Sequence, residues 1–170
     1  MKRIGMLTGG GDCPGLNAVI RGVVRTAKAE GWHVIGFTKG WKGIIQNVFV
    51  ELDEKSVAGI LPRGGTILGT SRTNPYKLAG DVEKVRETIK KNRLDAVIAI
   101  GGEDTLGAAN KLSKEGMPIV GVPKTIDNDL NATDYTFGYD TALNIATEGL
   151  DRIRTTAGSH ALPENSPIFF

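Results

Sequence analysis

Apolar residues occur in two patterns that alternate along the chain. Short apolar runs predict strands, and stretches in which apolar residues recur every three or four positions predict amphipathic helices. The runs at 95–100 and 117–122 contain almost no polar residues, so we expect these two strands to be buried on both faces. The expected strands are Ile4–Thr8, His33–Thr38, Asp95–Ile100 and Met117–Val122, and the expected helices are Asn17–Glu30, Asp81–Asn92, Asp104–Glu115 and Tyr139–Thr156.

The order of these elements predicts the fold class. Strands that alternate with helices form parallel βαβ units, with helices on both faces of the sheet. We therefore expect an α/β fold with a doubly wound, mostly parallel sheet. After Gly40 the pattern becomes irregular, and the stretch 63–80 has the composition of a loop. We expect one domain over residues 1–160 and a tail, 161–170, that does not belong to it.

Composition and charge narrow the classes of function. The 170 residues include 23 glycines, which favours loops with unusual backbone conformations. The 21 basic and 19 acidic side chains leave a net charge of +2, too small to predict a nucleic-acid-binding surface. No apolar run is long enough to cross a membrane. The single cysteine, Cys13, excludes an internal disulfide, and we expect a cytoplasmic protein.

The first candidate site is the loop between the first strand and the first helix. Gly9, Gly10 and Gly11 stand there, followed by Asp12. Backbone N–H groups in such a loop, together with the positive end of the helix, favour phosphate binding. A plain tight turn explains the glycines equally well, because a glycine loop alone is a weak signal.

Two further loops that follow apolar strands carry acidic side chains. Glu103 and Asp104 lie in one, and Asp127 and Asp129 lie in the other. An acid in a first helical turn usually serves the helix dipole, and an Asx turn needs only one such residue. We expect all three loops to meet at the carboxyl edge of the sheet. Four carboxylates beside a phosphate-binding backbone predict Mg²⁺-assisted phosphoryl transfer with one Asp as general base.

Four segments together resemble one family. They are LTGGGDCPGLNAVIRG, RGGTILGTSR, IGGEDTLGAA and PKTIDNDL. In this order and at this spacing they resemble the phosphofructokinase family over residues 1–160. The resemblance implies a doubly wound α/β domain that takes part in transferring a phosphoryl group to the 1-hydroxyl of fructose 6-phosphate.

The resemblance also implies roles for the residues at matching positions. Asp127 resembles the general base, Arg72 the arginine that stabilises the transition state, and Glu103 the Mg²⁺-associated acid, here one methylene longer than the family's Asp. Lys124 completes the catalytic set, because it can neutralise charge on the donor. The expected donor- and substrate-binding residues are Gly10, Gly11, Gly102, Asp104, Thr105, Thr125 and Asp129.

The pair formed by Asp104 and Lys124 bears on the phosphoryl donor. ATP-using members resemble one another in having glycine at both positions, whereas Asp with Lys looks like the pyrophosphate-using class. Asp104 would face the α-phosphate of a nucleotide, and two unit charges ~4 Å apart repel by ~4 kcal/mol at an effective dielectric of ~20. We therefore expect pyrophosphate, with ATP as the alternative. The plain structural alternatives are a helix cap for Asp104 and a solvated loop charge for Lys124.

Part of the family pattern has no match in this chain. The family's chains are much longer, and their second half supplies most of the fructose 6-phosphate contacts. We therefore expect a truncated or frame-shifted product with little or no activity of its own, from a family that forms homo-oligomers. Two other classes stay open: an NAD or lipid kinase, since those share a related Gly-Gly loop, and a non-catalytic remnant that binds phosphate or associates with intact copies of the protein through its exposed surface.

Overall fold

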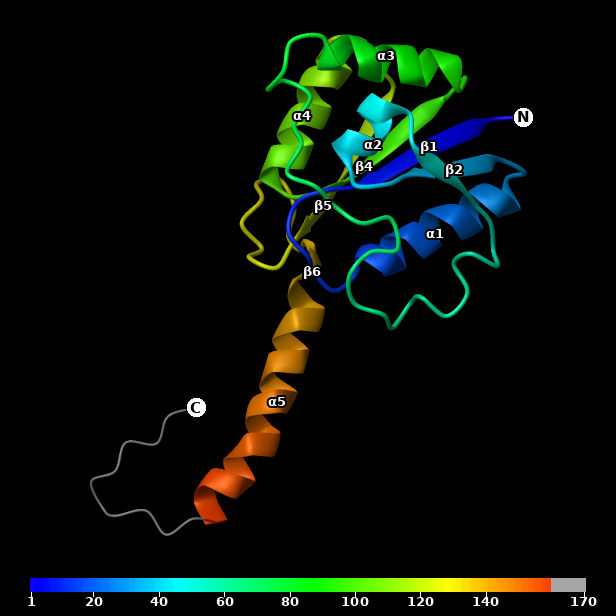
Figure 1. The fold of residues 1–170 in the computed structure, drawn as a ribbon. Helices are drawn as coiled ribbons and strands as arrows, with labels where there is room; N and C mark the ends of the chain where they lie inside the picture. The colour runs from blue at the N-terminus through cyan, green and yellow to red at the C-terminus, as the bar shows by residue number, and fades with distance from the viewer. Residues whose placement is uncertain (160–170) are drawn as a thin grey trace.

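In the computed structural model, which describes residues 1–159, six strands form one sheet in the order β3-β2-β1-β4-β5-β6 (Figure 1). Neighbouring strands are parallel, except that β2 and β3 pair antiparallel. The strands are β1 Arg3–Thr8, β2 His33–Phe37, β3 Phe49–Leu52, β4 Ala96–Gly101, β5 Ile119–Thr125 and β6 Phe137–Gly138. The helices are α1 Leu16–Ala29, α2 Trp41–Gln46, α3 Asp81–Lys91, α4 Glu103–Lys114 and α5 Tyr139–Ser159. The predicted doubly wound α/β class is confirmed.

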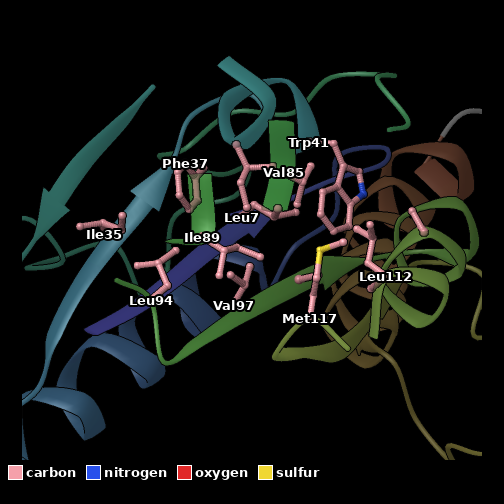
Figure 2. Packing of buried hydrophobic residues seen from close by; sticks show 14 residues of the cluster. Leu7, Ile35, Phe37, Trp41, Val85, Ile89, Leu94, Val97, Leu112 and Met117 are labelled. Carbon is pink, nitrogen blue, oxygen red and sulfur yellow. The ribbon is translucent and has the colours of Figure 1, made fainter. Parts of the chain in front are cut away.

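Two hydrophobic layers cover the two faces of the sheet. Helices α2, α3 and α4 pack on one face, where Leu7, Phe37 and Val97 are fully buried (Figure 2). Helix α1 and the segment 57–68 pack on the other face, against Ile4 and its neighbours on adjacent strands. Because successive residues of a strand point to opposite faces, each central strand contributes to both layers.

The strand order reverses between β1 and β4, and this reversal positions the site. After β1 the chain enters α1 on one face, whereas after β4 it enters α4 on the other face. The two loops therefore diverge and leave a crevice at the carboxyl ends of the strands, the usual place for a ligand in such sheets.

The structure contains elements that the sequence pattern did not predict. Helix α2 and strand β3 lie in the section after Gly40 that we expected to be irregular. Strand β5 also runs on through Lys124 and Thr125, which we expected in a loop, because these residues pair with Phe137 and Gly138 of β6. The expected boundary at Val122 is therefore wrong.

Strand β5 is less buried than expected. Ile119 packs against the α4 side of the sheet, but Val120, on the opposite face, is 57% exposed. The expectation that 117–122 is buried on both faces is wrong, because the helix that follows β5 does not fold back over the sheet. Helix α5 instead extends away from it (Figure 1), and its Leu150 and Ile153 are 51% and 56% exposed.

No helix among the described residues is long and apolar enough to cross a membrane. The predicted tail, 161–170, lies outside the described residues, so the boundary of the expected domain at residue 160 stays a prediction.

Candidate functional site

The loops after β1, β4 and β5 meet around one cavity of about 370 Å³ at the carboxyl edge of the sheet. The predicted convergence of the three loops is confirmed. All of the predicted site residues except Arg72 line this cavity. A second cavity of about 660 Å³ adjoins it and is lined by Arg72 together with Gly10, Gly11 and Asp104, which border both cavities.

The glycine loop lies so close to the neighbouring loop that side chains would not fit in part of it. The Gly9 N–H donates a hydrogen bond to the Ile100 carbonyl at 2.8 Å, and a Cβ on Gly9 would stand 2.4 Å from Oγ1 of Thr105. Gly10 has a φ of +84°, in the left-handed region that favours glycine. At Gly11 a Cβ would meet no atom within 4 Å, so this residue leaves its backbone open to the cavity.

Helix α4 begins at the cavity without a side-chain cap. Its N-cap, Gly102, lines the cavity, and no side chain makes a capping hydrogen bond there. Helix α1, which follows the glycine loop, has Gly15 as its N-cap and also lacks such a bond. The first N–H groups of such helices need an acceptor, and an anion supplies one. Asp104, in the first turn of α4, is exposed and makes no such cap, so a capping hydrogen bond does not account for it.

Lys124 lies beneath the glycine loop. Its side chain is buried, and its Nζ donates a hydrogen bond to the Gly11 carbonyl at 2.6 Å. Burial lowers the pKa of Lys124, while the nearby Cys13 thiol and the Asp12 and Asp127 carboxylates act in the opposite direction. The alternative of a solvated loop charge is therefore wrong. The amine is held against the backbone of the glycine loop, and Lys124 borders the cavity.

Asp127 and Thr125 form a local turn at the end of β5. The Asp127 N–H donates to Oγ1 of Thr125 at 3.2 Å, and that hydroxyl lies 3.4 Å from Oδ2 of Asp127. The Asp127 carboxylate is exposed to the cavity. It can therefore accept a proton from a hydroxyl that enters.

A second pair of residues, missed in the sequence, holds this turn. The Thr136 hydroxyl donates to the Thr125 carbonyl at 2.7 Å, and the Thr136 N–H donates to Oδ1 of Asn128 at 2.9 Å. Asn128 itself has a φ of +52°, a conformation that Asn tolerates better than most residues. The motif TIDND does place Asn128 beside the acids, but nothing in the sequence links it to Thr136.

Three acids of the cavity are candidates for contact with a metal. Glu103, Asp127 and Asp129 all line it and are all exposed. Among the described residues, no group of three or more acidic, histidine or cysteine side chains is close enough to hold an ion unaided. Mg²⁺ commonly takes one or two carboxylates and completes its shell with phosphate oxygens and water. The donor set fits a Mg²⁺ that enters with a phosphorylated ligand.

A third cavity, of about 650 Å³, lies at the opposite edge of the sheet, where β1 and β2 begin. It is lined by Arg3, His33 and Glu51, and an Arg3–Glu51 ion pair of 2.7 Å crosses it. Its volume is close to that of the second cavity, which the glycine loop also borders, so size does not decide between the two. It has no glycine loop or helix N-terminus, so we place the candidate site at the carboxyl edge.

Comparisons with known proteins agree with this geometry. The phosphofructokinase family model matches residues 3–165, and the chain belongs to the phosphofructokinase family. It is 63% identical over 159 residues to a pyrophosphate–fructose 6-phosphate 1-phosphotransferase of Amycolatopsis methanolica, with 93% of this chain and 47% of that protein covered. It is 60% identical over 159 residues to an ATP-dependent 6-phosphofructokinase 3 of Streptomyces coelicolor, with the same coverage of both.

The fold agrees as well. The structure superposes on that of phosphofructokinase from Saccharomyces cerevisiae with a TM-score of 0.83 at 30% identity, covering 94% of this chain and 25% of that one. The chain spans about half the length of the curated relatives that it matches.

Proposed function

We propose that this chain supplies the donor-binding half of a phosphofructokinase that uses pyrophosphate. In this reaction a bond forms between O1 of fructose 6-phosphate and one phosphorus of pyrophosphate, and the bridging P–O bond breaks. The products are fructose 1,6-bisphosphate and inorganic phosphate. The observation that carries the proposal is the position of Asp104, which borders both cavities, above a glycine loop held by Lys124.

The donor would bind at the glycine loop. Gly10, Gly11 and the uncapped start of α4 line the cavity, and their backbone N–H groups would bind the phosphate oxygens. Lys124 adds a positive charge below the loop, and Arg72 adds one from the side of the second cavity. Positive charges and oriented N–H groups stabilise the charge that develops on a transferred phosphoryl group.

The acceptor hydroxyl would approach from the side of β5. Asp127 would accept the proton that the 1-hydroxyl loses, a role that contributes roughly 10²–10⁴-fold to a rate. The Thr125 hydroxyl, 3.4 Å from Oδ2 of Asp127, keeps that carboxylate in place. Glu103 and Asp129 would hold Mg²⁺ together with the donor. When bound, Mg²⁺ would neutralise negative charge on the phosphates.

Charge at position 104 favours pyrophosphate over ATP. A nucleotide would have to continue from the glycine loop into the second cavity, past the Asp104 carboxylate, whereas pyrophosphate would end at the boundary between the two cavities. The repulsion of ~4 kcal/mol expected between two such charges corresponds to about a thousandfold in affinity. Overall identity does not decide the donor, because relatives at 63% and 60% identity carry names with different donors.

ATP is the second candidate donor, favoured by the size of the second cavity. Its volume of about 660 Å³ is in the range of pockets that bind small organic ligands. Trp41 borders this cavity, but its side chain is 2% exposed and packed in the core, so it offers no open ring on which a base could stack.

We also make proposals about the fructose 6-phosphate pocket, the assembly and the cellular location of the protein. The residues that complete the fructose 6-phosphate pocket would come from the half of the family chain that this chain does not span, so we expect little turnover from the chain alone. We also propose assembly into homo-oligomers and a cytoplasmic location.

Calorimetric titration of the chain with ligands offered one at a time tests this function. We expect pyrophosphate with Mg²⁺ to bind and ATP with Mg²⁺ to bind far more weakly. Preferential binding of NAD or a lipid would support another kinase class, and the absence of binding by any of these ligands would support a non-catalytic remnant.

A further inference from the structure

The segment that carries Arg72 has no regular secondary structure. Between β3 and α3 the described chain consists of turns and bends, from residue 53 to residue 80. Such a segment makes no ladder or helix hydrogen bonds of its own, so contacts with neighbouring elements fix its position. Val57, Ile60 and Leu68 pack in the core, the Lys39 N–H donates to the Leu68 carbonyl at 2.8 Å, and side chains make further hydrogen bonds to the segment. The position of Arg72 relative to the glycine loop therefore depends on these contacts.

Asn17 makes three of these contacts. Its side chain is 98% buried in the first turn of α1, since only 2% of it is exposed. The Nδ2 group donates hydrogen bonds to the carbonyls of Arg63 and Gly64 at 3.1 and 3.2 Å. The Oδ1 atom accepts a third from the Ile67 N–H at 2.9 Å. A primary amide supplies both donors and the acceptor, which neither Asp nor Ala can do.

Contacts further along the segment continue toward Arg72. The hydroxyl of Thr8, the last residue of β1, donates to the Gly69 carbonyl at 2.9 Å and lies 2.9 Å from the Thr66 hydroxyl. The Ser71 hydroxyl donates to the Lys39 carbonyl at 2.7 Å. The segment is thus attached to neighbouring elements at several points from Arg63, which contacts Asn17, to Ser71, the residue before Arg72.

We propose that Asn17 is a positioning residue, which sets the place of Arg72 beside the glycine loop by fixing residues 63–67 of the segment that carries it. The inference rests on the proposed function, because it gives Arg72 a role in binding the donor. Asn17 stands two residues after Gly15, the N-cap of α1, so a single side chain ties the helix that follows the glycine loop to the segment that carries the arginine.

A double-mutant cycle on the chain tests this role. Asn17→Ala should weaken the binding of pyrophosphate with Mg²⁺ about tenfold, measured by calorimetry. In an Arg72→Ala background the same change should weaken binding less than threefold, since the effect passes through Arg72. Equal losses in both backgrounds, or no loss in the parent, would overturn the proposal.

The double-mutant cycle needs an alternative variant at Asn17 and a control. Asn17→Asp keeps the acceptor for the Ile67 N–H and nearly the same shape, so it replaces Asn17→Ala in the cycle if the latter fails to fold, and the same pattern is expected. Asn110→Ala is the matched control, because Asn110 is exposed on α4. It should leave the affinity within a factor of two of the parent. A tenfold loss there would show that weaker binding is not specific to Asn17 and would overturn the proposal.

Amide NMR spectra without ligand separate this proposal from the proposed function. Asn17→Ala should speed hydrogen exchange at the Ile67 amide and shift the Arg72 amide signal, and Asn110→Ala should do neither. An unchanged Arg72 signal would overturn the positioning role, whether or not pyrophosphate binds. A chain that shows these shifts but binds no pyrophosphate would retain the positioning role and lose the proposed function.

Discussion

Nζ of Lys124 lies 2.6 Å from the carbonyl oxygen of Gly11 and donates a hydrogen bond to it. The contact joins the end of strand β5 to the glycine loop after β1 across 113 residues of sequence. It places a buried cation directly behind the backbone that we propose binds the phosphoryl donor. Removing the amine should therefore alter donor binding more than it alters the fold.

Lys124→Met keeps most of the side-chain length and removes the charge and the hydrogen bond. A hydrogen bond that involves a charged group contributes about 1.5–3 kcal/mol, so we expect pyrophosphate to bind about ten- to hundredfold more weakly. Calorimetry measures this affinity. Lys114→Met, at an exposed position in the last turn of α4, is the control and should bind as the parent does. An unchanged affinity in Lys124→Met would show that this amine does not act on the donor.

The lowered pKa of Lys124 predicts how stability depends on pH. Below its ordinary value of 10.5, the unfolded chain holds a proton on this amine that the folded chain releases more readily. Stability rises with pH wherever the unfolded state binds more protons. The free energy of unfolding of the parent, minus that of Lys124→Met, should therefore rise as the pH approaches 10.5 from below. Denaturant unfolding at a series of alkaline pH values measures this difference, and a flat or falling curve would contradict it.

The close packing around Gly138 predicts that adding a side chain there lowers the stability of the fold. A Cβ there would stand 1.9 Å from Sγ of Cys13 and 2.3 Å from the Pro14 carbonyl, and its φ is +104°. Gly138→Ala should lower the free energy of unfolding by about 2–4 kcal/mol, through overpacking and backbone strain. Gly22→Ala is the matched control. A Cβ on Gly22 meets no atom within 4 Å in α1, so this change should raise stability by up to about 1 kcal/mol. Equal effects of the two changes would argue against close packing at Gly138.

Asp127→Asn tests the general base. In a chain completed with the second half of the Amycolatopsis methanolica relative, we expect kcat to fall by about 10²-fold or more. Donor binding should stay within a few-fold of the parent, because we propose that Asp127 contacts the acceptor and not the donor. A steady-state assay gives kcat, and calorimetry gives donor affinity. Nearly normal turnover would reject Asp127 as the base.

The strand-loop-helix units around the site could be predicted from the sequence because their signals are local. The run Ile4–Thr8, the glycines after it and the helical spacing that follows specify the first unit without help from the rest of the chain. Helix α2 and strand β3 are only 6 and 4 residues long, too short for periodicity to be distinguished from chance. Their formation depends on tertiary contacts, such as the burial of Trp41 against the core (Figure 2).

The candidate site was predictable as a set of loops, but not in its supporting contacts. The acids and glycines follow the carboxyl ends of strands, where open α/β sheets bind their ligands. The burial of Lys124 depends on the pairing of β5 with β6, whose residues lie 13 positions further on. Asn17 bonds to residues 46–50 positions away, so its part in the site is visible only after folding.

The choice between pyrophosphate and ATP tests the account most directly. The completed chain should be assayed for fructose 6-phosphate phosphorylation with each donor in turn, beside the variant that carries both Asp104→Gly and Lys124→Gly. We expect kcat/KM with pyrophosphate to exceed that with ATP by about a thousandfold in the parent, and ATP use to improve in the variant. Equal or better use of ATP by the parent, or ATP kinetics that do not change in the variant, would contradict the role of Asp104 at the boundary of the two cavities.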